Sequence, residues 1–189
     1  MPLTAPPSID SARLQVRLVG ESDLAALMAV NGDDDVTRYL PYATWKSLPD
    51  AEAWFKRMAA IQATGMALQF VVVEKSTGIA VGTCLLFRYD EASARAELGF
   101  VLGRAHWGKG YMREAIAGLI DRAFGPMALR RLEAQIDPRN ASSRNLLQRL
   151  GFVKEGLLRE RWMDGAEGSD SELFGLLRRE WSASKGISP

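Results

Sequence analysis

The chain has 189 residues, of which 47% are hydrophobic and 25% are charged, and its formal net charge is +1. These values are typical of one ordinary globular domain, so we expect a single core over residues 13–181, with tails at 1–12 and 182–189. A charge so close to neutral excludes the strongly basic surface of a nucleic-acid-binding protein and an adhesive membrane surface.

Cysteine usage and the distribution of apolar residues bear on the cellular compartment. Cys84 is the only cysteine and lies in an apolar run, so it has no partner for an intramolecular disulfide. The first twelve residues contain prolines but no apolar segment typical of a signal peptide, and no run of about 18 apolar residues occurs in the sequence. We therefore expect a soluble, cytoplasmic protein.

Hydrophobic periodicity predicts mixed strands and helices through the first two thirds of the chain. Residues 13–18 alternate polar with apolar side chains, which indicates a strand with one buried face. Ser47 and Asp50 are suited to begin a helix that continues to about Thr64. Further strands are predicted at 68–74, 79–88, 94–102, 131–136, 152–158 and 171–177.

Two more helices are predicted in the second half of the chain. From Lys109 to Phe124 apolar residues recur at helical spacing, and the Gly125-Pro126 pair ends this longest helix. A shorter helix is expected from Ala141 to Leu150. Strands and helices therefore alternate on both sides of the longest helix.

A glycine-containing segment, GRAHWGKG at 103–110, joins a predicted strand to the longest helix. Glycines at 108 and 110 lack a Cβ, so an anion can approach the main-chain amides at the start of the helix. Lys109 and Arg104 can add positive charge. The segment predicts a phosphate-binding loop; an ordinary strand-to-helix turn is the alternative interpretation.

Two other phosphate-binding motifs do not fit this segment. Residues 103–109 satisfy the G-x-x-x-x-G-K part of a nucleotide triphosphatase loop, but Gly110 replaces the Ser or Thr that binds magnesium. The dinucleotide motif G-x-G-x-x-G also fails, because Arg113 takes the place of its last glycine. His106, the only histidine, has no cluster of metal-ligating residues around it in the sequence, so we expect no metal site.

Four motifs follow one another along the chain: AELGFVL at 96–102, WGKGYMREA at 107–115, NASS at 140–143 and LGF at 150–152. In order and spacing they resemble the GNAT superfamily of N-acetyltransferases, and residues 155–181 are similar to its branch of ribosomal-protein-alanine N-acetyltransferases. The resemblance implies an α/β (α+β) fold with a mixed, mostly antiparallel sheet of about seven strands, flanked by helices. It also implies that two central strands splay apart and that acetyl-coenzyme A (acetyl-CoA) lies between them.

The resemblance further implies which residues contact acetyl-CoA. Main-chain groups near Val101 and Leu102 pair with the pantetheine arm, and the Val101 amide polarises the thioester carbonyl. The family's loop begins with Gln or Arg, whereas this chain has Ala105 there, so phosphate binding depends mainly on main-chain amides. The other implied cofactor contacts are Arg104, Trp107, Gly108, Lys109, Gly110, Tyr111, Met112, Asn140 and Asn145.

Acetyl transfer to an amine requires a base that removes a proton from the acceptor. Glu97 is the only carboxylate on strand 94–102 and matches the family's strand-borne glutamate, so we expect it to act directly or through water. A solvent-facing or ion-paired structural role is its alternative. The family's proton-donating tyrosine is replaced by Leu147, which leaves the Ser143 hydroxyl as a candidate donor to the departing thiolate. Ser143 could instead cap a helix, and Asn140 could cap or bind pantetheine.

The expected reaction is acetyl transfer to a primary amine, either a protein N-terminus or a small molecule, by a monomer or homodimer. We expect no nucleic-acid and no membrane partner. A catalytically idle CoA-binding sensor is one alternative, because the tyrosine is missing. A protein-interaction module is the other, in which Asp33, Asp34 and Asp35 dock a basic partner together with Tyr39 and Trp45.

Overall fold

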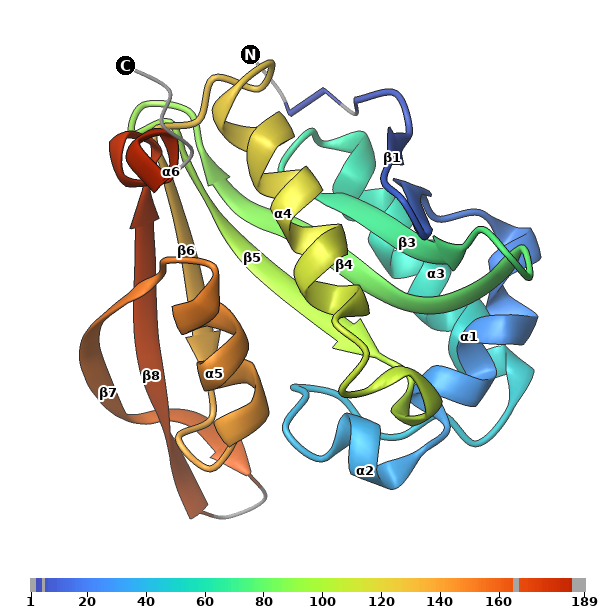
Figure 1. Ribbon diagram of the computed structural model, residues 1–189. Helices are drawn as coiled ribbons and strands as arrows, with labels where there is room; N and C mark the ends of the chain where they lie inside the picture. The colour runs from blue at the N-terminus through green and yellow to red at the C-terminus, as the bar shows by residue number, and fades with distance from the viewer. Residues whose placement is uncertain (1–2, 5, 165–166, 185–189) are drawn as a thin grey trace.

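The computed structural model describes residues 3–4, 6–164 and 167–184, in which helices cover both faces of one sheet (Figure 1). Its eight strands have the spatial order β1-β2-β3-β4-β5-β6-β8-β7. Neighbouring strands are antiparallel except β5 and β6, which are parallel. The predicted mixed, mostly antiparallel α/β sheet is therefore confirmed.

The strands are β1 (Ile9–Asp10), β2 (Leu14–Leu18), β3 (Leu68–Glu74), β4 (Ile79–Asp90), β5 (Arg95–Leu102), β6 (Arg131–Ile136), β7 (Val153–Asp164) and β8 (Glu167–Leu177). The α-helices are α1 (Leu24–Asn31), α2 (Asp34–Thr37), α3 (Leu48–Ala63), α4 (Tyr111–Phe124), α5 (Ala141–Arg149) and α6 (Arg178–Ser184). Two short 3₁₀ helices, η1 (Glu21–Asp23) and η2 (Arg104–His106), complete the described elements.

Strand β3 is buried on both faces because its side chains point alternately into two hydrophobic clusters. Phe70 and Val72 belong to the larger cluster, which includes the apolar residues of α4 and Leu147 of α5. Val71 and Val73 belong to the smaller cluster, which includes residues of α1 and α3. Figure 1 accordingly shows α4 and α5 on one face of the sheet and α1 and α3 on the other. Burying one valine or phenylalanine side chain completely stabilises the folded state by about 1.5–3 kcal/mol relative to leaving it exposed.

The predicted beginnings of α3 and α4 correspond to the observed ones. The Ser47 N–H and hydroxyl both donate to the Asp50 carboxylate, at 2.9 and 3.1 Å, at the start of α3. Helix α4 follows Gly110, whose left-handed φ of +78° suits glycine. Gly125 follows the last residue of α4, as predicted.

The structure corrects the expected count of about seven strands and the extent of the expected tails. Ile9–Asp10 forms β1 beside β2, and a strand of two residues is too short to show an alternating pattern. Ile9 is buried, and Gly118 of α4 leaves room for it, since a Cβ there would lie 2.8 Å from Ile9 Cγ2. At the other end, Ser182–Ser184 belong to α6, while residues 185–189 lie outside the described residues.

Strands β5 and β6 pair over only three residues and then separate. Their parallel register runs from Arg95↔Arg131 to Glu97↔Glu133, although β5 continues to Leu102 and β6 to Ile136. Figure 1 shows the two ribbons close at one end and apart at the other. The predicted splay of the central strands is therefore confirmed, and it begins at Glu97.

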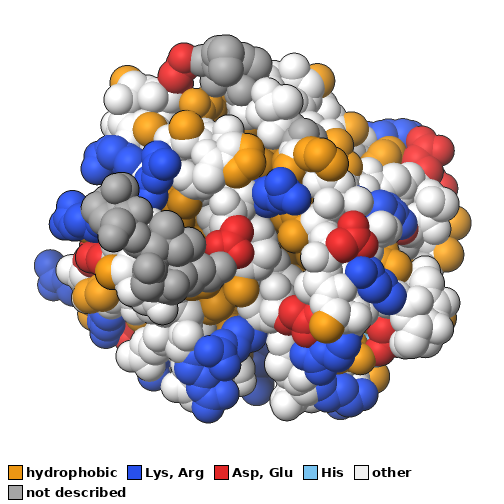
Figure 2. All heavy atoms as spheres, turned by 45° about the horizontal axis from the view of Figure 1, so that its top comes forward, with side chains coloured by type: hydrophobic (Ala, Val, Ile, Leu, Met, Phe, Trp, Pro, Cys, Tyr) orange, Lys and Arg blue, Asp and Glu red, His pale blue; other side chains and the backbone are white. Residues whose placement is uncertain are grey.

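The described surface carries charges of both signs. Figure 2 shows, on one face, lysine and arginine side chains in separate groups between acidic and hydrophobic ones. Among the described helices, none is long and apolar enough to cross a membrane. Nor do the described residues contain a group of three or more His, Cys, Asp or Glu side chains that could hold a metal ion.

Candidate active site

Glu97 lies where the pairing of β5 with β6 ends. Ala96 and Leu98 pack into the larger cluster beneath α4, so strand alternation directs the Glu97 side chain to the opposite face of the sheet. This side chain is only 6% exposed, and its Oε2 accepts a hydrogen bond from Arg88 Nη1 at 2.8 Å. Burial raises the pKa of Glu97 above its ordinary value, and the positive charge of Arg88 offsets part of this rise. A buried carboxylate with a raised pKa is suited to accept a proton.

Arg88 reaches Glu97 from an irregular point in β4. The register with β5 shifts between Phe87 and Asp90, and Arg88 has a left-handed φ of +49°. Its guanidinium lies 5.4 Å from the ring centroids of both Phe87 and Trp162. Glu97 is therefore ion-paired with a residue of the neighbouring strand β4, which is one form of the structural alternative to a catalytic role; the other expected partner, Arg95, pairs with Glu133 and Asp90 instead.

Gln135 of β6 is a neighbour of Glu97 that the sequence analysis missed. Its Nε2 lies 3.5 Å from Glu97 Oε2, at the limit of a hydrogen bond. Its Oε1 is buried and has no hydrogen-bond partner among the described residues. Leaving such an acceptor unpaired costs about 1–3 kcal/mol, so Gln135 is a candidate to receive an N–H from a ligand. The alternating pattern of residues 131–136 was the only signal for its orientation.

Main-chain groups of alternate β5 residues face the gap between β5 and β6. The Gly103 N–H donates to the Val81 carbonyl of β4 at 2.9 Å, and a Cβ on Gly82 would lie 2.3 Å from the Val101 carbonyl oxygen. Alternation therefore directs the main-chain groups of Val101 toward β4 and those of Phe100 and Leu102 toward the gap. This corrects the expectation that the Val101 amide polarises a thioester carbonyl in the gap; the Leu102 expectation is compatible with the geometry.

The glycine loop has the geometry of an anion site at the start of α4. Gly108 and Gly110 have φ values of +72° and +78°, and no atom lies within 4 Å of the position that a Gly108 Cβ would occupy. Main-chain N–H groups in the first turn of a helix lack intrahelical partners and attract anions. Trp107 Nε1 donates to the Leu102 carbonyl at 2.7 Å, which ties the loop to the end of β5. These residues fit the phosphates of a CoA-type ligand.

The side chains of two residues predicted to contact the cofactor are engaged in contacts within the protein. Met112 is buried in the larger cluster with its Sδ 3.7 Å from Cys84 Sγ, so only its main chain is available to a ligand. The Tyr111 hydroxyl donates to the Glu74 carboxylate, and its ring stacks with His106 at a centroid distance of 5.7 Å. The Met112 side chain therefore serves the core and the Tyr111 ring packs on the loop, while the main chain of both residues lies in the first turn of α4.

Arg13, immediately before β2, supports the glycine loop and was not predicted. Its Nη1 donates to the Lys109 carbonyl at 2.9 Å, and its Nη2 lies 2.6 Å from a Glu114 carboxylate oxygen. Its guanidinium also lies 4.5 Å from the centroid of the Tyr111 ring. No sequence motif connects residues this far apart, so only the fold reveals the contact. The Lys109 side chain itself is exposed.

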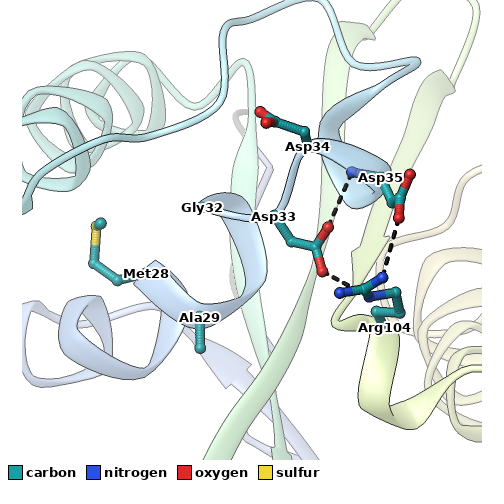
Figure 3. Close-up of a pocket in the computed structure, with 7 residues that line it drawn as sticks. All are labelled: Met28, Ala29, Gly32, Asp33, Asp34, Asp35 and Arg104. Atoms are coloured by element: carbon teal, nitrogen blue, oxygen red, sulfur yellow. Dashed lines mark hydrogen bonds and ion pairs between the residues drawn. The ribbon is translucent and has the colours of Figure 1, made fainter.

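Arg104, expected at the phosphates, is instead held by two carboxylates beside α2 (Figure 3). Its Nε lies 2.9 Å from Asp33 Oδ2 and its Nη1 lies 3.1 Å from Asp35 Oδ2. The Arg104 side chain is 59% exposed, so each ion pair contributes only about 0.2–1 kcal/mol. A shallow pocket here is lined by Met28, Ala29, Gly32, Asp33, Asp34, Asp35 and Arg104, none of which belongs to β5 or β6.

The start of α5 resolves which residue caps this helix. Asn140 Oδ1 accepts a hydrogen bond from the Ser143 N–H at 3.0 Å, so Asn140 is the N-cap and the Ser143 hydroxyl is not. Ser143 is half-buried, and Asn145 is exposed on the same helix. Leu147 occupies the position at which the family has its tyrosine. It is fully buried in the larger cluster and is therefore a core residue.

Comparison with known proteins agrees with this geometry. Residues 13–153 match the family model of the acetyltransferase (GNAT) domain. The chain therefore belongs to the GNAT family of acetyltransferases. It is 35% identical over 170 residues to the uncharacterized N-acetyltransferase p20 of Bacillus licheniformis, a match that covers 90% of this chain and 96% of that protein.

Two solved structures show the same fold. The ribosomal-protein-S5-alanine acetyltransferase of Vibrio fischeri superposes with a TM-score of 0.77 at 26% identity, over 93% of this chain and 99% of that one. The spermidine N-acetyltransferase of Vibrio cholerae, solved with CoA and spermine, superposes with a TM-score of 0.78 over 90% of this chain and 99% of that one. Its identity of 20% shows likeness of fold alone. The predicted resemblance to the ribosomal-protein branch is confirmed at the level of homology.

Proposed function

We propose that this chain transfers an acetyl group from acetyl-CoA to a primary amine, with Glu97 as the base. The observation that carries the proposal is the position of this buried carboxylate, at the point where β5 and β6 begin to separate. The gap beside it is bordered by main-chain groups that have no partner strand in the described β5–β6 register. A proton acceptor and a place for an extended ligand are thus adjacent.

The residues around the gap are suited to hold acetyl-CoA. When bound, it supplies an acetyl group as a thioester, whose C–S bond breaks as the amine nitrogen forms the new amide bond. The main-chain groups of Phe100 and the N–H of Leu102 would pair with the pantetheine arm, since the Leu102 carbonyl already accepts a hydrogen bond from Trp107. The amides that follow Gly108 and Gly110 would bind the phosphates, and Arg13, which is ion-paired with Glu114, holds this loop through the Lys109 carbonyl.

Glu97 would take the proton that the amine must lose. Amines have pKa values of about 8 to 10.4, so most acceptor molecules are protonated at neutral pH. The raised pKa of Glu97 brings it nearer to the operating pH, where a general base is most effective. The Arg88 charge favours the ionised carboxylate, and Gln135 Oε1, which has no partner among the described residues, can accept a second N–H of the amine.

Ser143 is our candidate to protonate the departing thiolate. Since Asn140 caps α5, the Ser143 hydroxyl is not needed for capping. It lies in the first turn of the helix that follows β6, whose end borders the gap. Leu147 cannot fulfil this role because it is an apolar core residue.

Two alternatives make different predictions. A CoA-binding sensor would bind the cofactor without turnover, and the replacement of the family's tyrosine by Leu147 is the observation in its favour. A docking module based on the acidic segment is disfavoured, because Asp33 and Asp35 are paired with Arg104 and Asp34 with Lys46.

The test is release of free thiol from acetyl-CoA over a panel of primary amines. Cys84 is fully buried, and burial raises the pKa of its thiol to about 12, so thiol reagents report CoA rather than the folded protein. Glu97→Gln is expected to lower kcat by roughly 10²–10⁴ with unchanged CoA affinity. Glu133→Gln, which alters the register partner of Glu97 on β6, is the matched control and should retain most activity.

An unchanged kcat in Glu97→Gln contradicts the assignment of the base. Loss of turnover in Glu133→Gln alone would transfer that role to Glu133. CoA binding without thiol release for any amine supports the sensor.

A further inference from the structure

Two arginines share one aromatic ring beside Glu97. The guanidinium carbon of Arg88 lies 5.4 Å from the Trp162 ring centroid, and that of Arg161 lies 5.5 Å from the same centroid. Arg88 contacts Glu97 directly, and the charge of Arg161 is near enough to lower the pKa of that carboxyl. Two positive charges therefore stand at the approach to the buried carboxylate.

A bulge in β7 positions Arg161 and Trp162. The register with β8 shifts between Leu158 and Trp162, and Glu160 has a left-handed φ of +49°. The Glu160 N–H donates to Asp170 Oδ1 at 2.9 Å, which braces the bulge against β8. Trp162 is 40% exposed, so the two guanidinium groups lie at the surface rather than in the core.

The nearby carboxylates do not neutralise both arginines. Glu133 is paired with Arg95, at 2.9 Å, and with Arg131, at 2.8 Å. Arg88 uses Nη1 on Glu97, and Arg161 has no ion pair within the part of the chain that the structure describes. Stacking on an aromatic ring holds a guanidinium in place while leaving its N–H donors available in the ring plane.

We propose that the acceptor amine carries a carboxylate, which Arg161 and Arg88 bind while Glu97 and Gln135 receive the amine N–H groups. The inference rests on the proposed function and specifies its substrate class. A guanidinium binds a carboxylate through two parallel hydrogen bonds, which orients as well as attracts it. A polyamine is disfavoured, because its additional ammonium groups would meet the two guanidinium groups.

The experiment compares matched acceptors in the thiol-release assay. One arm uses free amino acids and their amino amides; a second uses peptides with Asp or Asn as second residue; spermidine is a third. The acid of a matched pair is expected to have a kcat/KM at least about tenfold above that of its amide. The first two arms distinguish a main-chain carboxylate from a side-chain carboxylate as the group that is bound.

Arg161→Gln tests the assigned contact. At a pH above the acidic limb of kcat, where Glu97 is ionised with or without the Arg161 charge, the change should raise KM for the preferred carboxylate acceptor about tenfold. At that pH, kcat, CoA affinity and the KM of the matched amide should stay nearly unchanged. Arg159→Gln, an exposed arginine of the same bulge for which the structure gives no contact to Trp162, is the matched control. Recovery of the low KM in Arg161→Lys would show that positive charge is what the site requires.

Three results overturn the inference. Acids and amides could be acetylated equally well, spermidine could be preferred, or Arg161→Gln could alter KM for both members of a pair alike. Each of these leaves acetyl transfer itself intact. Absence of transfer to every amine, with CoA still bound, contradicts the proposed function and the inference together.

Discussion

Arg88 Nη1 donates to Glu97 Oε2 across 2.8 Å, from a backbone position with a φ of +49°. Few residues other than glycine adopt this conformation without cost, so the surrounding structure must hold Arg88 in place. The pair joins a cation that is 40% exposed to a carboxylate that is 6% exposed. Arg88 therefore favours the ionised form of the Glu97 carboxyl and offsets part of the effect of its burial.

Replacing Arg88 should change the pH dependence of turnover. Without the positive charge of Arg88, the effect of burial is offset less and the pKa of Glu97 rises further. Since turnover requires the ionised carboxylate, the acidic limb of kcat in Arg88→Gln should move to higher pH. Saturating acceptor removes any effect of weaker acceptor binding. Arg88→Lys retains a charge and should move the limb less. An unmoved limb, or a shift to lower pH, would be incompatible with the proposed role of the pair.

Gly108 should be required for CoA binding beyond its contribution to stability. Gly108 and Gly78 have similar left-handed φ values of +72° and +69°, and neither Cβ position has an atom within 4 Å. Either glycine-to-alanine change should lower the free energy of unfolding by about 1–2 kcal/mol. Only Gly108→Ala should weaken CoA binding, by about tenfold or more, because its methyl group would hinder approach to the loop amides. Calorimetric titration with CoA and denaturant unfolding distinguish the two effects. Equal CoA affinity in the Gly108→Ala and Gly78→Ala variants would contradict a role for the glycine loop in CoA binding.

Gln135 should serve the acceptor rather than stability. Gln135→Leu removes a buried oxygen that has no partner among the described residues, so the free energy of unfolding should stay the same or rise. KM for the acceptor should increase about tenfold, with CoA affinity unchanged. Steady-state kinetics and thermal unfolding are the measurements. A variant with a lower free energy of unfolding and an unchanged KM for the acceptor would show that Gln135 stabilises the fold and does not bind the acceptor.

Ser143 and Ser142 provide a matched pair for the proton donor. Ser143→Ala should lower kcat by about 10²-fold if its hydroxyl protonates the thiolate, whereas Ser142→Ala, at an exposed neighbour, should not. Neither change removes the helix cap, since that comes from Asn140. Asn140→Ala should instead cost about 1 kcal/mol of stability. Equal turnover in both serine variants would exclude Ser143 as the donor.

Local sequence patterns were sufficient to predict those helices and strands that are specified by residues within or beside the element itself. The alternation in Arg131–Ile136, the capping residues Ser47 and Asp50, and the stripe of α4 each predicted an observed element. Strand β1 was not predicted, because a strand of two residues is too short to show an alternation of polar and apolar side chains. The motif order implied the family, and with it the splay of β5 and β6.

Long-range partners could not be read from the sequence. Arg104 was expected at the phosphates because it adjoins the glycine loop, yet Asp33 and Asp35, distant in the chain, hold it. The Val101 amide was placed in the gap by analogy, whereas the hydrogen-bond phase of β4 with β5 directs it away. An ion pair or a strand phase depends on which distant segments pack together, and local spacing contains no information about that.

The sequence by itself therefore determined the elements, the glycine loop and the carboxylate Glu97, because these follow from periodicity and residue chemistry. Only the tertiary structure decided what surrounds that carboxylate. Arg88 comes from a bulge in β4, Gln135 from β6 and Trp162 from a bulge in β7. Burial and charge at one point depend on all three strands meeting there, and these two quantities set the pKa of Glu97.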